Sequence, residues 1–168
     1  MDLLIEMIVK KKSDYLDYLI ILGTIIISFI VAFIAILVAG PLYFSIAIVL
    51  IAILAYVGYR IITSRNIEYE YSLTNGDLEI SKIIAQRKRK RIFYGDCRQF
   101  EMIDRVPSDK HNNAVNSVTS KIRSVSSMNS EHVYFIITQF NSKRVIVYFE
   151  PNDKILSGIK TFNKKAFR

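Results

Sequence analysis

The residue types that most often carry catalysis or bind metals are scarce in this sequence. Cys97 is its only cysteine, and His111 and His132 are its only histidines. A structural zinc site needs four such ligands, usually at short and regular spacing, and these three residues do not provide it. No GxSxG, HExxH, P-loop or GxGxxG motif occurs. We therefore expect a protein without catalytic residues, metal or cofactor, and not an enzyme.

The most distinctive chemical feature is a run of five consecutive cations: Arg87, Lys88, Arg89, Lys90 and Arg91. Near an anionic leaflet each cation contributes on the order of 1 kcal/mol of binding, so the run is a candidate lipid- or partner-binding surface. Two other interpretations stay open: a solvated strand or turn whose charges add only solubility, and a surface for an acidic protein or nucleic acid. Nucleic acid is disfavoured, because few aromatic side chains alternate with these cations.

Two apolar runs precede these cations, Leu19–Ala39 and Leu42–Ile62, and Arg60 is the only charged residue in them. A helix needs about 20 apolar residues to cross ~30 Å of hydrocarbon, and each run provides them. Gly40-Pro41 leaves only a short link, so residues 19–62 are predicted to form a two-span helical hairpin. For the N-terminal segment, residues 1–18, an amphipathic helix on the inner leaflet and a frayed tail are both open.

Small side chains recur along the first span, where they form a ridge that lets helices approach closely. They are Thr24, Ser28, Ala32, Ala35 and Ala39. The ridge either packs within the hairpin, which we favour, or forms a face for oligomerisation or for a membrane partner.

The distribution of Lys and Arg predicts the orientation of the hairpin. Lys10, Lys11 and Lys12 flank it on one side and Arg60 and Arg65 on the other, while its tip has neither. Residues 63–168 contain nineteen Lys and Arg against eleven Asp and Glu. The positive-inside rule places both termini in the cytoplasm, which predicts a multi-pass protein of a cytoplasmic membrane.

After the hairpin the pattern changes to the alternation of half-buried strands. Apolar side chains occupy every second position from Ile67 to Leu73, and Asn75-Gly76 follows, the typical sequence of a two-residue hairpin turn. Such a turn places Leu73 opposite Leu78 and Tyr71 opposite Ile80, apolar against apolar, so turn and pattern predict the same register.

The rest of residues 63–168 predicts further strands and one helix. Strand-like segments are 88–94, 98–103, 133–140 and 145–149, and the polar segment 106–130 is either mobile or contains a short strand around 118–125. Pro151 opens a helix with one apolar stripe. Six or seven antiparallel strands and a C-terminal helix predict an α+β domain, a bent sheet or open barrel closed by the helix.

The run NIEYEYSLTNGDLEISKIIAQRKRKRIFYGDCRQFE, residues 66–101, resembles the opening of bacterial pleckstrin-homology-like (PH-like) domains. The whole layout resembles a family of small two-span bacterial membrane proteins in which a near-identical EYEYxLTNGxLxIxKIIxxxxRKR stretch follows the second span. The resemblance covers most of the chain, and its specific motifs lie between Asn66 and about Glu101. It implies the PH-like fold and a bacterial inner membrane, and it implies no activity.

These observations predict a non-catalytic docking or regulatory module, tethered to the membrane, with a basic cytoplasmic PH-like domain that contacts anionic lipid or a protein partner. The alternative is an accessory subunit of a membrane protein complex that acts through its hairpin. A homo-oligomer or a membrane protein partner fits either interpretation.

Overall fold

The structure is a computed structural model that describes the chain except residues 1–2, 109–110, 112–117, 119 and 168. The chain divides into two compact units. The helical unit is Ser13–Asn66, and the sheet unit combines the residues up to Lys12 with those from Ile67 onward. The sheet unit is therefore built from chain on both sides of the helical unit.

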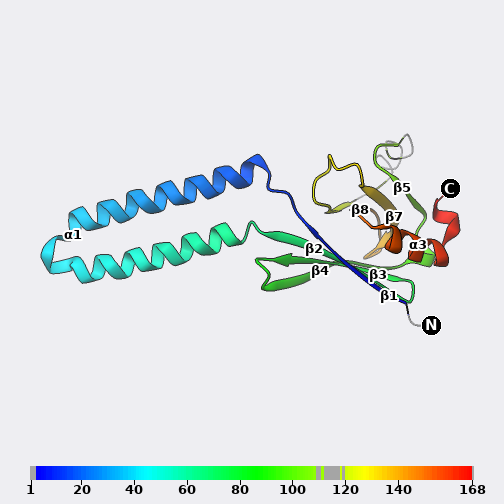
Figure 1. Ribbon diagram of the computed structural model, residues 1–168, viewed down its shortest axis with the longest axis horizontal. Coiled ribbons are helices and arrows are strands. Elements are labelled where there is room, and N and C mark those ends of the chain that lie inside the picture. Colours follow the sequence, from blue (N-terminus) through cyan, green and yellow to red (C-terminus); the bar gives the residue numbers. More distant parts are fainter. Residues whose placement is uncertain (1–2, 109–110, 112–117, 119, 168) are drawn as a thin grey trace. The chain divides into compact units, whose positions relative to one another are not determined.

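The helical unit contains α1 (Tyr15–Thr63), which is broken at Gly40, where φ is 54°. Glycine adopts this left-handed conformation without the steric cost that a side chain brings. The two segments, Tyr15–Gly40 and Tyr43–Thr63, are long and apolar enough to cross a membrane by length and composition, as expected, and they run antiparallel (Figure 1). At their open ends the guanidinium of Arg65 lies 3.6 Å from the carboxylate of Asp17.

The ridge of small side chains lies on the side of the first segment that faces the second. All of its members are half-buried, whereas most neighbouring side chains are exposed: Thr24, Ser28, Ala32, Ala35 and Ala39. A Cβ built on Gly58 of the second segment would lie 3.6 Å from Ser28 Oγ and from Thr24 Cγ2. Thr24 and Ser28 of the ridge thus lie beside Gly58 of the second segment.

The first sheet has four antiparallel strands in the order β1-β2-β3-β4 (Figure 1). They are β1 (Leu4–Lys10), β2 (Ile67–Thr74), β3 (Asp77–Ile84) and β4 (Lys88–Asp96). Tyr71 lies opposite Ile80 and Leu73 opposite Leu78, and all four side chains are buried. The predicted register is confirmed. Asn75 and Gly76 form the turn at positive φ, 51° and 98°.

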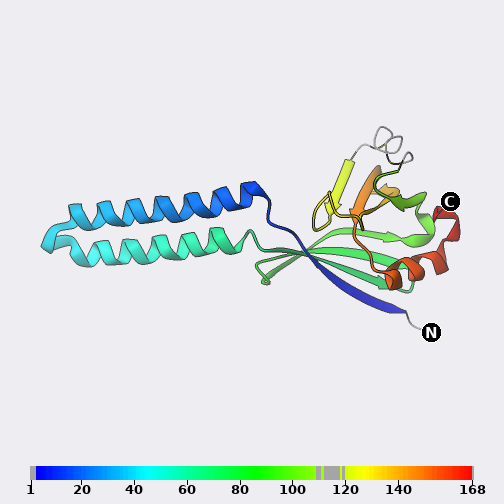
Figure 2. The ribbon, with the colours of Figure 1, turned by 45° about the horizontal axis from the view of Figure 1, so that its top comes forward.

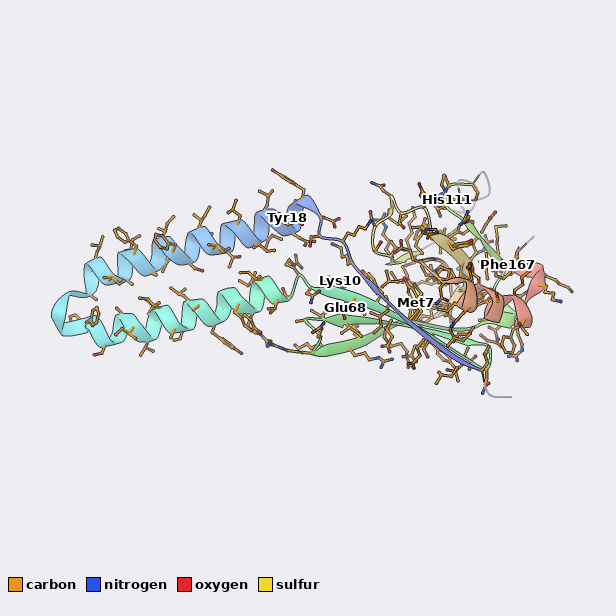
Figure 3. All side chains as sticks on the ribbon, viewed as in Figure 1. Met7, Lys10, Tyr18, Glu68, His111 and Phe167 are labelled. Atoms are coloured by element: carbon orange, nitrogen blue, oxygen red, sulfur yellow. The ribbon has the colours of Figure 1, made fainter. Side chains whose placement is uncertain are left out.

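Strand β1 corrects the expectation for the N-terminus, which is neither an amphipathic helix nor a frayed tail. It pairs along its whole length with β2, from Leu4 opposite Thr74 to Lys10 opposite Glu68, and Figure 3 labels this last pair. Its burial alternates, because Ile5, Met7 and Val9 pack against the core while Leu4 and Ile8 are exposed. An apolar side chain at every second position is typical of a strand with one buried face, and residues 4–10 follow this pattern.

The second sheet has the order β5-β7-β8-β6. Its strands are β5 (Met102–Arg105), β6 (Ser120–Ser124), β7 (Tyr134–Phe140) and β8 (Lys143–Phe149). Strand β6 confirms the short strand expected near 118–125, while residues 109–110, 112–117 and 119 of the polar segment lie outside the described residues. It pairs with β8 in parallel, so the expectation of purely antiparallel pairing is wrong at this edge (Figure 2, yellow).

Two other boundaries differ from expectation. The strand expected at 98–103 begins only at Met102, because Cys97–Gln99 forms a 3-10 turn, η1. The carboxylate of Asp96 accepts a hydrogen bond from the N–H of Arg98 in this turn. The C-terminal helix α3 (Asp153–Phe162) begins two residues after Pro151, because the side chain of Asn152 accepts a hydrogen bond from the N–H of Ile155.

The hydrophobic core lies between the two sheets, with α3 packed at one end. Side chains from both sheets and from α3 share one cluster, including Tyr71, Ile80, Phe93, Phe149 and Ile155. The 3-10 turn η2 (Lys164–Phe167) adds Ala166 to it. Two apolar helices, an open arrangement of sheets and a C-terminal helix confirm the expected PH-like α+β class. The described residues form eight strands rather than six or seven, because β1 joins from before the hairpin.

Candidate membrane-facing basic site

The basic run lies at the turn between β3 and β4 and along the first half of β4. Ala85 and Gln86 form the turn at positive φ, 53° and 54°, and the N–H of Arg87 donates to the carbonyl of Ile84 at 3.1 Å. Strand β4 is an edge of the first sheet. Residues 88–91 are all exposed, so their charges stay in water.

A β-bulge decides where these cations point. Ile80 lies opposite Phe93, but the next residue of β3, Ser81, lies opposite Arg91, so Ile92 is an extra residue in β4. A bulge shifts the alternation of side chains by one position. As a result Arg89 and Arg91 share one face of the sheet with Ser81, and Lys88 and Lys90 share the other face with Lys82.

The two arginines lie on the outer face, which is turned away from the core, and both are paired there. Arg89 Nη2 lies 2.9 Å from a carboxylate oxygen of Glu70, and Arg91 Nη1 lies 3.8 Å from one of Glu79. Arg91 also lies over the ring of Tyr94, 5.5 Å from its centroid. The arginine side chains are exposed, whereas that of Glu70 is only 12% exposed. Both pairs occupy the arginine charges.

The lysines lie on the inner face, which carries the core residues Tyr71 and Ile80. Lys90 is directly opposite Lys82, and Lys88 is opposite Ile84. Among the residues that the structure describes, none is hydrogen-bonded to or ion-paired with the side chains of these three lysines. The structure thus divides residues 88–91 of the run into two paired arginines and two unpaired lysines.

The pairing of strands also fixes which end of the sheet carries the run. Ile84, just before the basic turn, lies opposite Ile67, the first residue of β2. Ile67 follows the last residue of α1, Thr63, by four positions. On its other side Ile67 accepts a hydrogen bond from the N–H of Lys11 at 2.9 Å. The basic turn and both connections to the hairpin therefore belong to the same end of the first sheet.

Cys97 shows no sign of reactivity. Its side chain is fully buried, and this burial raises the pKa of its thiol to about 12, with a smaller contribution from the negative charge of Asp96. The thiolate is the nucleophilic form, so this environment suppresses nucleophilic chemistry.

The histidines lie apart from each other and from Cys97. The Nε2 of His111 lies 2.9 Å from the hydroxyl oxygen of Tyr148 and its ring packs beside Phe135, and partial burial lowers its pKa. His132 lines a different hollow. In the described part of the chain no group of three or more His, Cys, Asp or Glu side chains is placed to hold a metal ion.

Sequence reasoning missed a polar cluster at the junction of the two sheets. The hydroxyl of Tyr71 donates to the carbonyl of Ser124 and accepts from the N–H of Glu150 at 3.1 Å. The buried carboxylate of Glu150 accepts from both the N–H and the hydroxyl of Ser126. Burial raises the pKa of Tyr71. The cluster fixes the sheets to each other, and the regular alternation around Tyr71 gives no signal for it.

A hollow of about 420 Å³ lies beside this cluster. It is lined by Met7 and Val9 of β1, by Ser126 and His132, and by residues 150–153. Its lining mixes apolar and acidic groups, and Glu150 is already satisfied by Ser126.

Comparison with known proteins gives the family of the chain. The model of the family described as Bacterial PH-like domain (DUF6106) matches residues 1–168, which includes the helical hairpin as well as the two sheets. No curated protein and no solved structure matches the chain. The chain therefore belongs to the bacterial PH-like domain family DUF6106.

Proposed function

We propose that this protein is a non-catalytic membrane-tethered docking or regulatory module whose PH-like domain contacts the anionic inner leaflet through Arg87–Arg91. PH-like domains often bind lipids or proteins, and membership of the family supports a binding role. In this proposal the hairpin keeps the domain permanently at the bilayer, and the cations set its orientation against the lipid.

The observation that carries this proposal is the register Ile67–Ile84–Lys88 across β2, β3 and β4. The step of four positions from Thr63 to Ile67 spans at most about 14 Å, and neighbouring strands are about 4.8 Å apart. A sheet attached to a spanning helix in this way has its basic turn within reach of the lipid head groups.

The orientation follows from charge and from chain topology. Strand β1 precedes the hairpin and pairs with β2, which follows it, so both ends of the hairpin lead to the same domain. That requires an even number of crossings, in agreement with two spans. Lys10, Lys11, Lys12 and Arg65 flank the spans, and the positive-inside rule then places the domain in the cytoplasm.

The packing of the hairpin supports this role over that of an accessory subunit acting through its spans. The small-residue ridge, the feature that would serve a partner helix, faces the second segment of the same hairpin at Gly58.

Hydrogen exchange of the full chain in nanodiscs tests the proposal. Peptides that cover residues 84–92 are expected to exchange more slowly in discs with anionic phosphatidylglycerol than in zwitterionic discs. The difference should vanish in 1 M salt, where the screening length is about 3 Å. Peptides from α3 serve as the internal control. Equal exchange at 84–92 in both kinds of disc at low salt would refute the lipid contact.

A further inference from the structure

The four cations of the run that lie in β4, residues 88–91, differ in whether a carboxylate already pairs with them. Arg89 and Arg91 lie on the outer face against Glu70 and Glu79, at 2.9 and 3.8 Å. Lys88 and Lys90 lie on the inner face, where Lys82 of β3 joins them. An anion that approaches the outer face meets carboxylates that already compete for the arginines. Of these charged groups, an anion that approaches the inner face meets only the unpaired ammonium groups of Lys82, Lys88 and Lys90.

The pair Lys82–Lys90 is itself unfavourable in the isolated sheet. Residues directly opposite each other on antiparallel strands have Cβ atoms about 5 Å apart, and like charges in these positions destabilise the pairing. A phosphate group between the two side chains would remove the repulsion, because it accepts hydrogen bonds from both ammonium groups. Lys88 lies two residues from Lys90 on the same face and adds a third donor.

We propose that Lys82, Lys88 and Lys90 form the binding site for the phosphate of an anionic lipid head group, whereas Arg89 and Arg91 hold the outer face of the sheet together. This inference rests on the proposed function and assigns its lipid contact to particular side chains. Lysine suits the role, because its ammonium is a compact charge with three donors on a flexible stem.

The source of the phosphate follows from the position of the lysines. Lys88 shares a cross-strand row with Ile84 and Ile67, and Lys90 shares the next inward row with Lys82 and Tyr69. Two rows along a strand are about 7 Å apart. The three ammonium groups therefore belong to the end of the sheet from which the chain passes into the hairpin, so the membrane lipid is the anion that this geometry favours.

Two double variants of the full chain with equal loss of charge test this assignment. In detergent, native mass spectrometry measures how much phosphatidylglycerol the protein retains. Lys88→Gln with Lys90→Gln is expected to weaken retention about thirtyfold, the effect of losing two cations near an anionic surface. Arg89→Gln with Arg91→Gln is expected to weaken it less than threefold. Lys164→Gln with Lys165→Gln, in the C-terminal turn η2, is the matched control and should leave retention unchanged.

The outcomes separate this inference from the proposed function. An equal loss in the lysine and arginine variants, or a larger loss in the arginine variant, would overturn the lysine site and leave the basic run as a lipid contact. Unchanged retention in both would overturn the lipid contact as well.

Thermal unfolding in detergent without added lipid gives a second, independent readout. Lys90→Gln is expected to raise the unfolding temperature, because it removes the repulsion with Lys82, and added phosphatidylglycerol should abolish this advantage. A lower unfolding temperature for Lys90→Gln in a variant that keeps wild-type secondary structure would contradict the repulsion on which the site depends.

Discussion

Cys97 is the only thiol of the chain, and because it is buried we expect it to react slowly with thiol reagents. Burial raises its pKa to about 12, so at pH 8 its thiolate fraction is roughly a thousandfold below that of an exposed cysteine. We expect maleimide labelling of the folded protein to be slower by at least this factor and to become fast in denaturant. Labelling of the folded protein at the rate of a free thiol would show that this part of the core is not closed.

Single residues also show where sequence reasoning succeeded. Asn75 and Gly76 fix the turn between β2 and β3, and the alternation from Ile67 to Leu73 fixes the buried face, so local chemistry determines the register. The faces of Lys88 and Lys90 could not be found in this way. They depend on the bulge at Ile92, which results from the fit of β4 to β3 and has no clear signal in a run of charges.

Among the secondary-structure elements, β1 is the one that the sequence did not predict, because an amphipathic helix or a frayed tail was expected in its place. The run Leu3, Ile5, Met7 and Val9 alternates perfectly, but a short segment before a membrane helix also suits an amphipathic helix. The strand forms because the edge of β2 is free to pair with it. Strand β2 follows the hairpin in sequence, so residues 1–18 alone do not reveal this pairing. A fragment that starts at residue 63 would therefore lack one strand of the first sheet.

Excision of the hairpin tests this architecture. Lys11 and Ile67 are hydrogen-bonded neighbours, so a short Gly-Asn-Ser loop in place of residues 13–66 closes the chain without strain. We expect this protein to be soluble and monomeric, with the exchange protection of β2 seen in the full chain. The fragment 66–168, which exposes the unpaired edge of β2 and the apolar face that β1 covers, is expected to aggregate. Equal solubility of the two would contradict a structural role for β1.

At the scale of the whole molecule, composition and hydropathy predicted the two apolar helices, and charge distribution predicted the orientation proposed here. The sequence could not show that the sheet domain contains residues from both before and after the hairpin, because this follows from the pairing of β1 with β2. It also could not show the division of the cations into paired and unpaired sets, since this depends on acids from β2 and β3 that lie across the sheet.

The location of the domain relative to the membrane is the claim on which the proposed function depends. Two single-cysteine variants in a Cys97→Ala background test it: Pro41→Cys in the link between the two spans of the hairpin, and Lys143→Cys at the exposed first residue of β8. Each is treated with a membrane-impermeant maleimide in intact bacterial cells and in inside-out vesicles. We expect Pro41→Cys to react in cells and Lys143→Cys to react only in inside-out vesicles. Reaction of Lys143→Cys in intact cells would contradict a cytoplasmic domain and, with it, contact with the inner leaflet.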